Sequence, residues 1–298
     1  MIVHIGFPKT GTTFLQKSVF VHCKNFIFLD YHSVDKFLYR TIFFDELDFD
    51  IKKEYKRLHN LFPGDNLLIS YELLIGPVFL RSGVNRSLIS GRLKKLGAKK
   101  VIISVRNQVD LIESLYRQYV NQGGTLKPSE VLVYEGDYPK YTHGILIKMF
   151  DYYKLIKLYQ DNFGKENVLV FQQEQLKKNK LDTIKRIADF IGDNEMYQGF
   201  YNAKSTTDKN KGLSYYSVKI LRFFNRFTSN FFSPKSFFGN FFTSWKIRIL
   251  LGKYLDPLFL SRLSNKRNFI KGTPHQQKIT SYFRETNKMI LDEMGITI

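Results

Sequence analysis

The feature that most constrains the fold is the stretch Ile2–Gln16, which reads IVHIGFPKTGTTFLQ. A short apolar run is interrupted by Gly and Pro, and a Thr-rich turn then leads into a helix-like segment. This pattern predicts a strand, a tight loop and a helix N-terminus. Such a loop directs several backbone N–H groups at one point, where the helix dipole adds partial positive charge. The sequence therefore predicts a phosphate or sulfate site, to which Gly11 gives close backbone approach and Lys9 a full charge.

The spacing of this loop differs from that of nucleoside-triphosphatases. Their loop reads G-x-x-x-x-G-K-[ST], in which the lysine binds the γ-phosphate and the hydroxyl binds Mg²⁺. Gly6 and Gly11 have this spacing, but Thr12 stands where the lysine should be, and Lys9 precedes the second glycine. Such a loop is poorly suited to a metal-bound triphosphate. We expect instead a 5′-phosphate that carries a group able to leave without the help of a metal.

Further apolar runs alternate with helix-like segments, which predicts an α/β fold with a parallel, doubly wound sheet. The expected strands are 26–29, 66–70, 100–105 and 168–171, and the expected helices are 14–22, 51–61, 85–96, 110–121, 145–163 and 181–191. The stretch 31–50 shows no clear period. Lys9, Glu72 and Arg106 each follow a predicted strand, and ligands of such sheets bind beyond the carboxyl ends of the strands. We therefore expect these three side chains to reach one crevice.

A second anion contact is expected at the end of the run 100–105. Arg106 follows this run, and its planar guanidinium is suited to clamping a phosphate. Ser114 lies about two turns into the next predicted helix, from where its hydroxyl can reach the same anion.

Two of these segments resemble motifs of the sulfotransferases that use 3′-phosphoadenosine 5′-phosphosulfate (PAPS). The segment 7–14, FPKTGTTF, resembles their 5′-phosphosulfate loop, and the segment 106–116, RNQVDLIESLY, resembles their 3′-phosphate motif. The segment 163–192 is similar to the corresponding part of bacterial and carbohydrate sulfotransferases, with Gln173-Glu174 in place of their usual Tyr-Glu pair. The resemblance implies a P-loop-like parallel sheet flanked by helices, with a helical C-terminal extension.

The resemblance also implies an activity, which is transfer of a sulfuryl group from PAPS to an acceptor hydroxyl without a metal. The donor-binding residues that it implies are Pro8, Lys9, Thr10, Gly11, Thr12, Thr13, Phe14, Arg106 and Ser114. Phe14 is expected at the adenosine part. In the family a late basic segment closes over the 3′-phosphate, and Lys209 and Lys211 are the candidates here, with solvent-facing charge as the alternative. A glycan or glycolipid is the expected acceptor.

Transfer to a hydroxyl requires a base that takes the acceptor's proton. Glu72 is the candidate, because it directly follows a predicted strand and no histidine lies near it in the sequence. Lys9 is placed to stabilise charge on the leaving phosphate oxygen. His143 is the fallback base and Asp30 a weaker candidate, whereas His4, inside the first strand, is expected to be structural.

The net charge of +19 attracts polyanions, without choosing among nucleotides, nucleic acid, anionic glycans and anionic membranes. The length of 298 residues and the 43% hydrophobic content suit one sulfotransferase domain, with an α/β core over 1–192 and a mainly helical, aromatic-rich extension over 193–298. The single cysteine predicts a reducing compartment. No signal-peptide pattern or membrane-spanning run is recognisable, so the expected location is the cytoplasm, with or without membrane association.

Two segments and two competing functions stay open at this point. The segment 123–144, with Tyr134, Tyr138, Tyr141 and His143, suits either acceptor recognition or a packed lid. The Phe-rich stretch 223–245 suits helices packed on the core, or an amphipathic surface that touches an anionic membrane or a partner chain. A P-loop kinase would need Mg²⁺ and the missing lysine, and a non-catalytic polyanion-binding protein predicts steep salt dependence.

Overall fold

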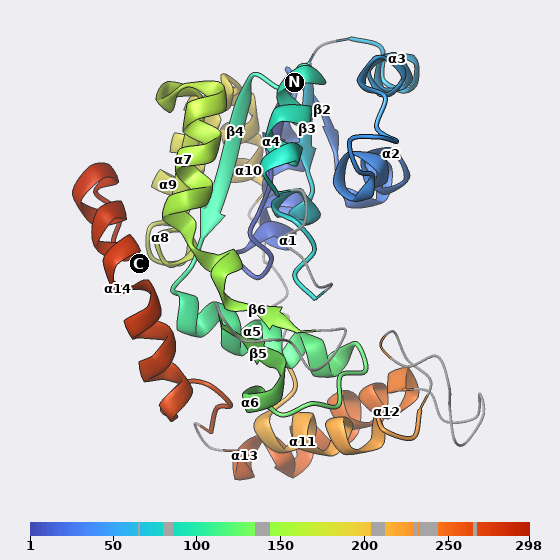
Figure 1. The fold of residues 1–298 in the computed structure, drawn as a ribbon, viewed down its shortest axis with the longest axis vertical. Coiled ribbons are helices and arrows are strands. Elements are labelled where there is room, and N and C mark those ends of the chain that lie inside the picture. Colours follow the sequence, from blue (N-terminus) through green and yellow to red (C-terminus); the bar gives the residue numbers. More distant parts are fainter. Residues whose placement is uncertain are drawn as a thin grey trace.

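The computed structural model is a parallel sheet with helices on both of its faces (Figure 1). It describes residues 1–64, 66–79, 86–134, 144–203, 212–228, 232, 244–264 and 267–298. Within these residues the strand order is β2 (Ile27–Leu29), β3 (Leu67–Ser70), β1 (Ile2–His4), β4 (Lys100–Val105) and β7 (Val168–Gln172), with every pair parallel. The predicted α/β fold class, with a P-loop-like parallel sheet and helical additions, is confirmed.

Both faces of the sheet are buried, and successive strand residues join different hydrophobic clusters. Val101 and Ile103 of β4 belong to the larger cluster, whereas Ile102 between them belongs to the smaller one. The larger cluster includes residues of α2 (Tyr31–Phe43), α4 (Arg86–Lys95), α5 (Gln108–Asn121), α7 (Tyr152–Phe163) and α14 (Pro274–Met294). The smaller cluster includes residues of η1 (Leu15–Val19), α9 (Lys180–Ile191) and α10 (Asn194–Asn202). A strand buried on both sides reads as a continuous apolar run, which is why the sequence predicts β4 at its observed bounds.

The other helical elements are mostly short connections around this frame. They are α1 (Thr12–Phe14), η2 (Phe20–His22), α3 (Ile51–Leu61), η3 (Glu72–Ile75), α6 (Pro128–Val131), η4 (Ile147–Phe150), η5 (Lys165–Asn167), α8 (Gln173–Lys178), α11 (Tyr215–Phe224), α12 (Ser244–Leu250), η7 (Leu251–Leu260) and α13 (Ser261–Leu263). The short strands β5 (Leu132–Val133) and β6 (Ile145–Leu146) form a separate parallel pair. Among the described residues, no helix combines the length and the apolar character needed to cross a bilayer.

The helix α2 occupies a stretch in which the sequence shows no period. Asp30 is its N-cap, because its carboxylate accepts hydrogen bonds from the Ser33 amide at 3.1 Å and the Ser33 hydroxyl at 2.9 Å. Val34 and Phe37 are buried on the inner face of α2, while Tyr39 on its outer face is exposed. Asp30 therefore caps the helix, and its place as a weaker base candidate stays a prediction.

The helix predicted over 145–163 begins later than expected. Residues 145–150 form β6 and the 3₁₀ turn η4, and α7 starts at Tyr152. The reason is the Asp151 carboxylate, which accepts a hydrogen bond from the Lys154 amide at 3.2 Å and so caps the helix there.

After α9, every element in the described part of the chain is a helix. α10 packs on α9, α11 packs on α5, and the long α14 lies along α7 and α5 (Figure 1). At its far end the Glu293 carboxylate pairs with Lys157 of α7 at 3.1 Å. α14 starts with Pro274 and stops before Gly295, which has a φ of 66°. Of the Phe-rich stretch, Phe223 and Phe224 are exposed on α11, and residues 229–231 and 233–243 lie outside the described residues.

Candidate active site

The loop between β1 and α1 has an unusual backbone. Gly6 and Gly11 have φ angles of 87° and 97°, and Lys9, with φ at 65°, is the one non-glycine residue of the described chain with a positive φ. A non-glycine residue held in this region costs about 1–3 kcal/mol, and such residues cluster at functional sites. A Cβ on Gly6 would come within 3.3 Å of the Cα of Glu72. The glycine thus lets Glu72 pack directly against the loop.

The loop also offers free backbone donors. The Leu15 amide bonds the Gly11 carbonyl at 3.1 Å and so closes the first helical turn. The amides of Gly11, Thr12 and Thr13 make no hydrogen bond to any residue that the structure describes. Unpaired amides are normal in the first turn of a helix, where the positive end of the dipole also lies. The loop therefore has the donors of an anion site.

Glu72 opens η3, directly after β3, and its carboxylate lies beside the loop. Desolvation raises the pKa of the Glu72 carboxyl, whereas a hydrogen bond with the Thr12 hydroxyl and the positive charge of Lys9 oppose this rise. A carboxylate with a raised pKa is a better proton acceptor, because its pKa lies closer to neutral pH. The raised pKa of Glu72 agrees with the general-base role that the sequence predicts for it, and that role stays a prediction.

The ammonium group of Lys9 lies in a positive field. Desolvation in the crevice lowers the pKa of Lys9, the Glu72 carboxylate raises it, and the charges of Arg248 and Arg106 lower it further. Arg248 belongs to α12, so the charge of a residue late in the chain acts on this loop. Several cations converging on one loop are tolerated most easily when an anion is bound between them.

Arg106 lies against the same loop. Its Nη1 donates to the Lys9 carbonyl at 3.2 Å, and its own carbonyl accepts the Tyr152 hydroxyl at 2.8 Å. Its Nε is buried and has no hydrogen-bond partner among the described residues. A buried guanidinium nitrogen without a partner is costly, so its N–H is available to an anionic ligand at this position.

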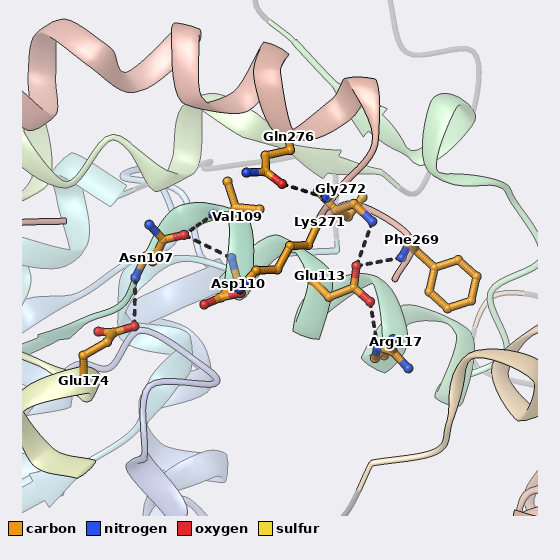
Figure 2. A network of polar contacts seen from close by, with 11 residues as sticks. Asn107, Val109, Asp110, Glu113, Arg117, Glu174, Phe269, Lys271, Gly272 and Gln276 are labelled. Carbon is orange, nitrogen blue, oxygen red and sulfur yellow. Dashed lines mark hydrogen bonds and ion pairs between the residues drawn. The ribbon is translucent and has the colours of Figure 1, made fainter. Parts of the chain in front are cut away.

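The helix α5 starts directly after Arg106, and a polar network surrounds its N-terminus (Figure 2). The Asn107 side chain caps it by accepting the amides of Val109 at 3.1 Å and Asp110 at 3.3 Å. The Asn107 amide in turn donates to the Glu174 carboxylate at 3.3 Å. Because Glu174 lies in α8, directly after β7, this contact joins the ends of two neighbouring strands.

A late segment of the chain, residues 267–272, lies along α5 (Figure 2). The Glu113 carboxylate accepts the amides of Phe269 at 2.9 Å and Ile270 at 2.7 Å, and Arg117 pairs with the same carboxylate at 2.7 Å. Lys271 pairs with Asp110 at 3.1 Å. Ser114 is half-buried and lies one helical turn after Asp110, so the two share a face of α5. The ammonium of Lys271 is thus held close to the turn that carries Ser114.

The structure places Lys9, Glu72 and Arg106 next to one another and leaves Ser114 further along α5, with no contact that joins it to Arg106. Phe14 is half-buried and packs edge-on against Phe200, with the ring centroids 5.9 Å apart. The remaining loop residues differ in burial: Pro8, Thr10 and Thr12 are buried, and Thr13 is exposed. The candidates His143, Lys209 and Lys211 lie outside the described residues.

Lys271 is a basic residue held beside α5 that the sequence analysis does not single out. Its one signal is the Lys271-Gly272 pair before Thr273-Pro274, a residue pair typical of a helix start. The contact that brings it to α5 depends on Glu113 binding backbone amides, and backbone partners leave no pattern in a sequence.

A parallel sheet with a glycine-bounded loop after its first strand is a P-loop-like fold. A family model described as "Sulfotransferase domain" matches residues 1–233, and the chain belongs to this family. It is therefore an enzyme of the sulfotransferase class, as its two motifs predict.

The chain is also similar to solved sulfotransferase structures, at low sequence identity. A sulfotransferase from Alicyclobacillus acidocaldarius is 14% identical, with 76% of this chain and 91% of that chain covered and a TM-score of 0.47. The mouse sulfotransferase SULT7A1, complexed with PAP, is 15% identical, with coverage of 99% and 85% and a TM-score of 0.42. The sulfotransferase domain from the curacin biosynthetic pathway is 15% identical, with coverage of 95% and 97% and a TM-score of 0.40. Among curated proteins, no sequence matches this chain.

Proposed function

We propose that this sulfotransferase takes its sulfuryl group from PAPS and transfers it to an acceptor hydroxyl. The observation that supports this most is the cluster that Lys9, Glu72 and Arg106 form at one loop. A cation, a carboxylate with a raised pKa and a guanidinium are the groups that transfer from a phosphosulfate to a hydroxyl requires.

The hydrogen-bond donors and positive charges around the loop suit a bisphosphorylated nucleotide. The free amides of Gly11, Thr12 and Thr13 and the ammonium of Lys9 suit the 5′-phosphosulfate. The unpartnered Nε of Arg106 suits a phosphate that bridges from the loop towards α5. By the resemblance of the segment 106–116, this group is the 3′-phosphate, and Ser114 is its second contact. When bound, PAPS supplies a sulfuryl group whose bond to the phosphate oxygen breaks during transfer.

Each of these groups then has one role in the reaction. Glu72 takes the proton of the acceptor hydroxyl as the oxygen attacks. Lys9 and the loop amides stabilise the negative charge that grows on the leaving phosphate oxygen. Arg106 and Ser114 hold the donor in line, so that its reactive end faces Glu72. Phe14 contacts the adenosine part, because its ring packs on Phe200 but stays half-exposed to a ligand.

For the acceptor we propose a glycan or glycolipid hydroxyl, reached from the surface of an anionic membrane in a reducing, cytoplasmic compartment. The support is the late helical part, where α11 exposes Phe223 and Phe224 and η7 exposes Leu258 and Phe259. Between 212–228 and 244–264 this part has seven Lys and Arg residues against one Asp, Asp256. Exposed apolar and basic side chains together suit an anionic bilayer surface. A screen with labelled PAPS against glycan and lipid-linked acceptors, with and without anionic vesicles, tests this choice.

Replacing Arg106 by Ala is expected to weaken binding of 3′,5′-bisphosphoadenosine (PAP) by about 10- to 100-fold, because a charged hydrogen bond contributes about 1.5–3 kcal/mol. Isothermal titration calorimetry measures this directly. The control Arg57→Ala removes an arginine from α3 and is expected to bind PAP like the wild-type protein. If the wild-type protein binds long polyanions with a steep salt dependence, but neither binds PAP nor turns over PAPS, it is a polyanion-binding protein instead.

Replacing Lys271 by Ala is expected to weaken PAP binding by about 5-fold, because an exposed charge contributes about 1 kcal/mol. The matched control is Lys157→Ala, since Lys157 and Lys271 each pair with one carboxylate at 3.1 Å. Titrations of PAP into both variants measure whether Lys271 contributes to PAP binding. Equal affinities for the two variants would limit Lys271 to holding residues 267–272 on α5.

A further inference from the structure

A row of polar side chains crosses the sheet beneath the loop. His4 of β1 is in register with Ser70 of β3, and Ser104 of β4 lies on its other side. All three are fully buried, and the His4 ring is covered by Phe20 and Phe171, with ring centroids 5.6 Å and 6.5 Å away. The pKa of His4 is lowered by burial, and no charged group contributes to this shift. Polar groups in such a place are costly unless they are hydrogen-bonded, and a buried network whose members are satisfied holds the surrounding segments rigidly in place.

On one side the row leads into the loop. His4 Nε2 is 3.1 Å from Ser104 Oγ, which is 2.5 Å from Thr10 Oγ1, and the Thr10 hydroxyl donates to the Phe7 carbonyl. A carbonyl only accepts, so Thr10 gives its one proton to Phe7 and accepts from Ser104. Ser104 then has no proton left for the ring. It therefore accepts an N–H from His4 Nε2.

On the other side the row leads to the strand end that precedes Glu72. His4 Nδ1 is 2.8 Å from Ser70 Oγ, and the Gln16 amide nitrogen donates to Ser70 Oγ at 3.1 Å and to the Ser70 carbonyl at 3.0 Å. An amide nitrogen only donates, and accepting from it leaves the Ser70 hydroxyl proton available to His4 Nδ1. The Thr10 side therefore places the ring proton on Nε2, and the Ser70 side accommodates a neutral ring with none on Nδ1. Burial lowers the pKa of His4 to about 3, which keeps the ring neutral.

We propose that His4 is a positioning residue for sulfuryl transfer, whose neutral ring fixes Thr10 of the donor loop relative to the strand end that carries Glu72. The two residues lie in different strand–loop units, and the row of hydrogen bonds links Thr10, through the ring, to Ser70, which lies two residues before Glu72. Thr10 is the direct neighbour of Lys9, whose strained backbone needs such an anchor. A displacement of about 1 Å at a reacting group costs about 10²-fold in rate, so a small shift of the loop is sufficient to matter.

The tautomer is tested without any substrate by ¹⁵N NMR of the histidine rings, with His4 assigned by its loss in a His4→Gln variant. The expected result is a protonated Nε2 and an unprotonated Nδ1, with no titration between pH 5 and pH 9. A ring protonated on Nδ1, or one that titrates near the ordinary histidine pKa, overturns the proposal, because the row would then run differently.

The positioning role rests on the proposed function, and kinetics with PAPS test it. His4→Phe keeps the ring but removes both hydrogen bonds, and its kcat is expected to fall about 10²-fold. His4→Gln places an amide N–H near the position of Nε2–H, and it is expected to recover most of this loss. Ser104→Ala breaks the same link with a smaller change, and it serves as the test if His4→Phe does not fold. The double variant is expected to be no slower than the slower single variant.

A buried serine elsewhere is the control for stability alone. Ser90 accepts a hydrogen bond from Asn162 at 2.8 Å, and Ser90→Ala is expected to lower the melting temperature without lowering kcat. Unchanged kcat in Ser104→Ala, equal losses in His4→Phe and His4→Gln, or multiplicative losses in the double variant overturn the proposal. A wild-type protein that binds no PAP and transfers no sulfuryl group overturns the proposed function and the positioning role together. The NMR result still decides the direction of the row in that case.

Discussion

A Lys9→Ala variant is expected to lose about 10²- to 10³-fold in kcat, which is the usual cost of removing one preorganised donor from a developing oxyanion. The ammonium is the one full charge that the donor loop itself supplies, and the Lys9 carbonyl is held by Arg106. The loss should appear in kcat more than in PAP affinity, because charge grows on the leaving oxygen only during transfer. Single-turnover measurements with PAPS separate the two quantities.

The strained backbone of Lys9 gives this experiment an internal control. At a φ of 65°, Ala is as strained as Lys, whereas Gly is not. Lys9→Ala and Lys9→Gly should therefore lose turnover equally, with the glycine variant at least as stable to heat. Lys17→Ala, an exposed lysine two residues after the start of η1, should keep full activity. If Lys9→Gly recovers turnover that Lys9→Ala loses, backbone geometry matters more than charge, and the assigned role is wrong.

The parts of the site that the sequence predicts are those in which the chain itself supplies both position and chemistry. The strand 100–105 is apolar throughout and ends at Arg106, so its bounds and the direction of the guanidinium follow from burial. The loop is predictable for the same reason, since Gly6 and Gly11 mark the two positions of positive φ around Lys9. Local pattern decides the structure at both places.

The missed parts depend on contacts between distant segments. In α2 the buried positions Val34, Phe37 and Leu38 do have helical spacing, but Tyr39 and Phe43 place aromatic rings around the rest of the helix and hide the period. The position of residues 267–272 depends on Glu113 binding their backbone amides, which any sequence offers. Their approach to α5 is therefore a property of the packed molecule.

The row beneath the loop lies between these two cases. His4, Ser70 and Ser104 each stand out as polar residues within or at the end of an apolar strand, and this much is visible in the sequence. The sequence does not show that the three residues share one face of the sheet, because this depends on strand order and register. The expectation of a structural His4 agrees with its burial, and the direction of its hydrogen bonds becomes apparent only in three dimensions.

A Glu72→Gln variant is expected to lose about 10²- to 10⁴-fold in turnover, the usual contribution of a positioned base, while PAP affinity stays near that of the wild-type protein. Desolvation raises the pKa of Glu72 in the folded protein, so the charged carboxylate is disfavoured by folding above its unfolded pKa. Gln removes that charge and keeps the shape of the side chain. The variant should therefore be at least as stable as the wild-type protein at neutral pH, although the charge of Lys9 loses its partner.

The pH profile of kcat/KM provides the sharper test of the same residue. In the wild-type protein the rate should fall as pH decreases through the raised pKa of Glu72, because the base must be unprotonated. It should also fall at high pH, below the ordinary lysine pKa, because the pKa of Lys9 is lowered. Glu72→Gln should abolish the acidic limb and keep the alkaline one, and Glu195→Gln, at an exposed site on α10, should keep both. Near-normal turnover in Glu72→Gln would make the base assignment wrong, and a matching loss in His143→Gln would then identify His143 as the base.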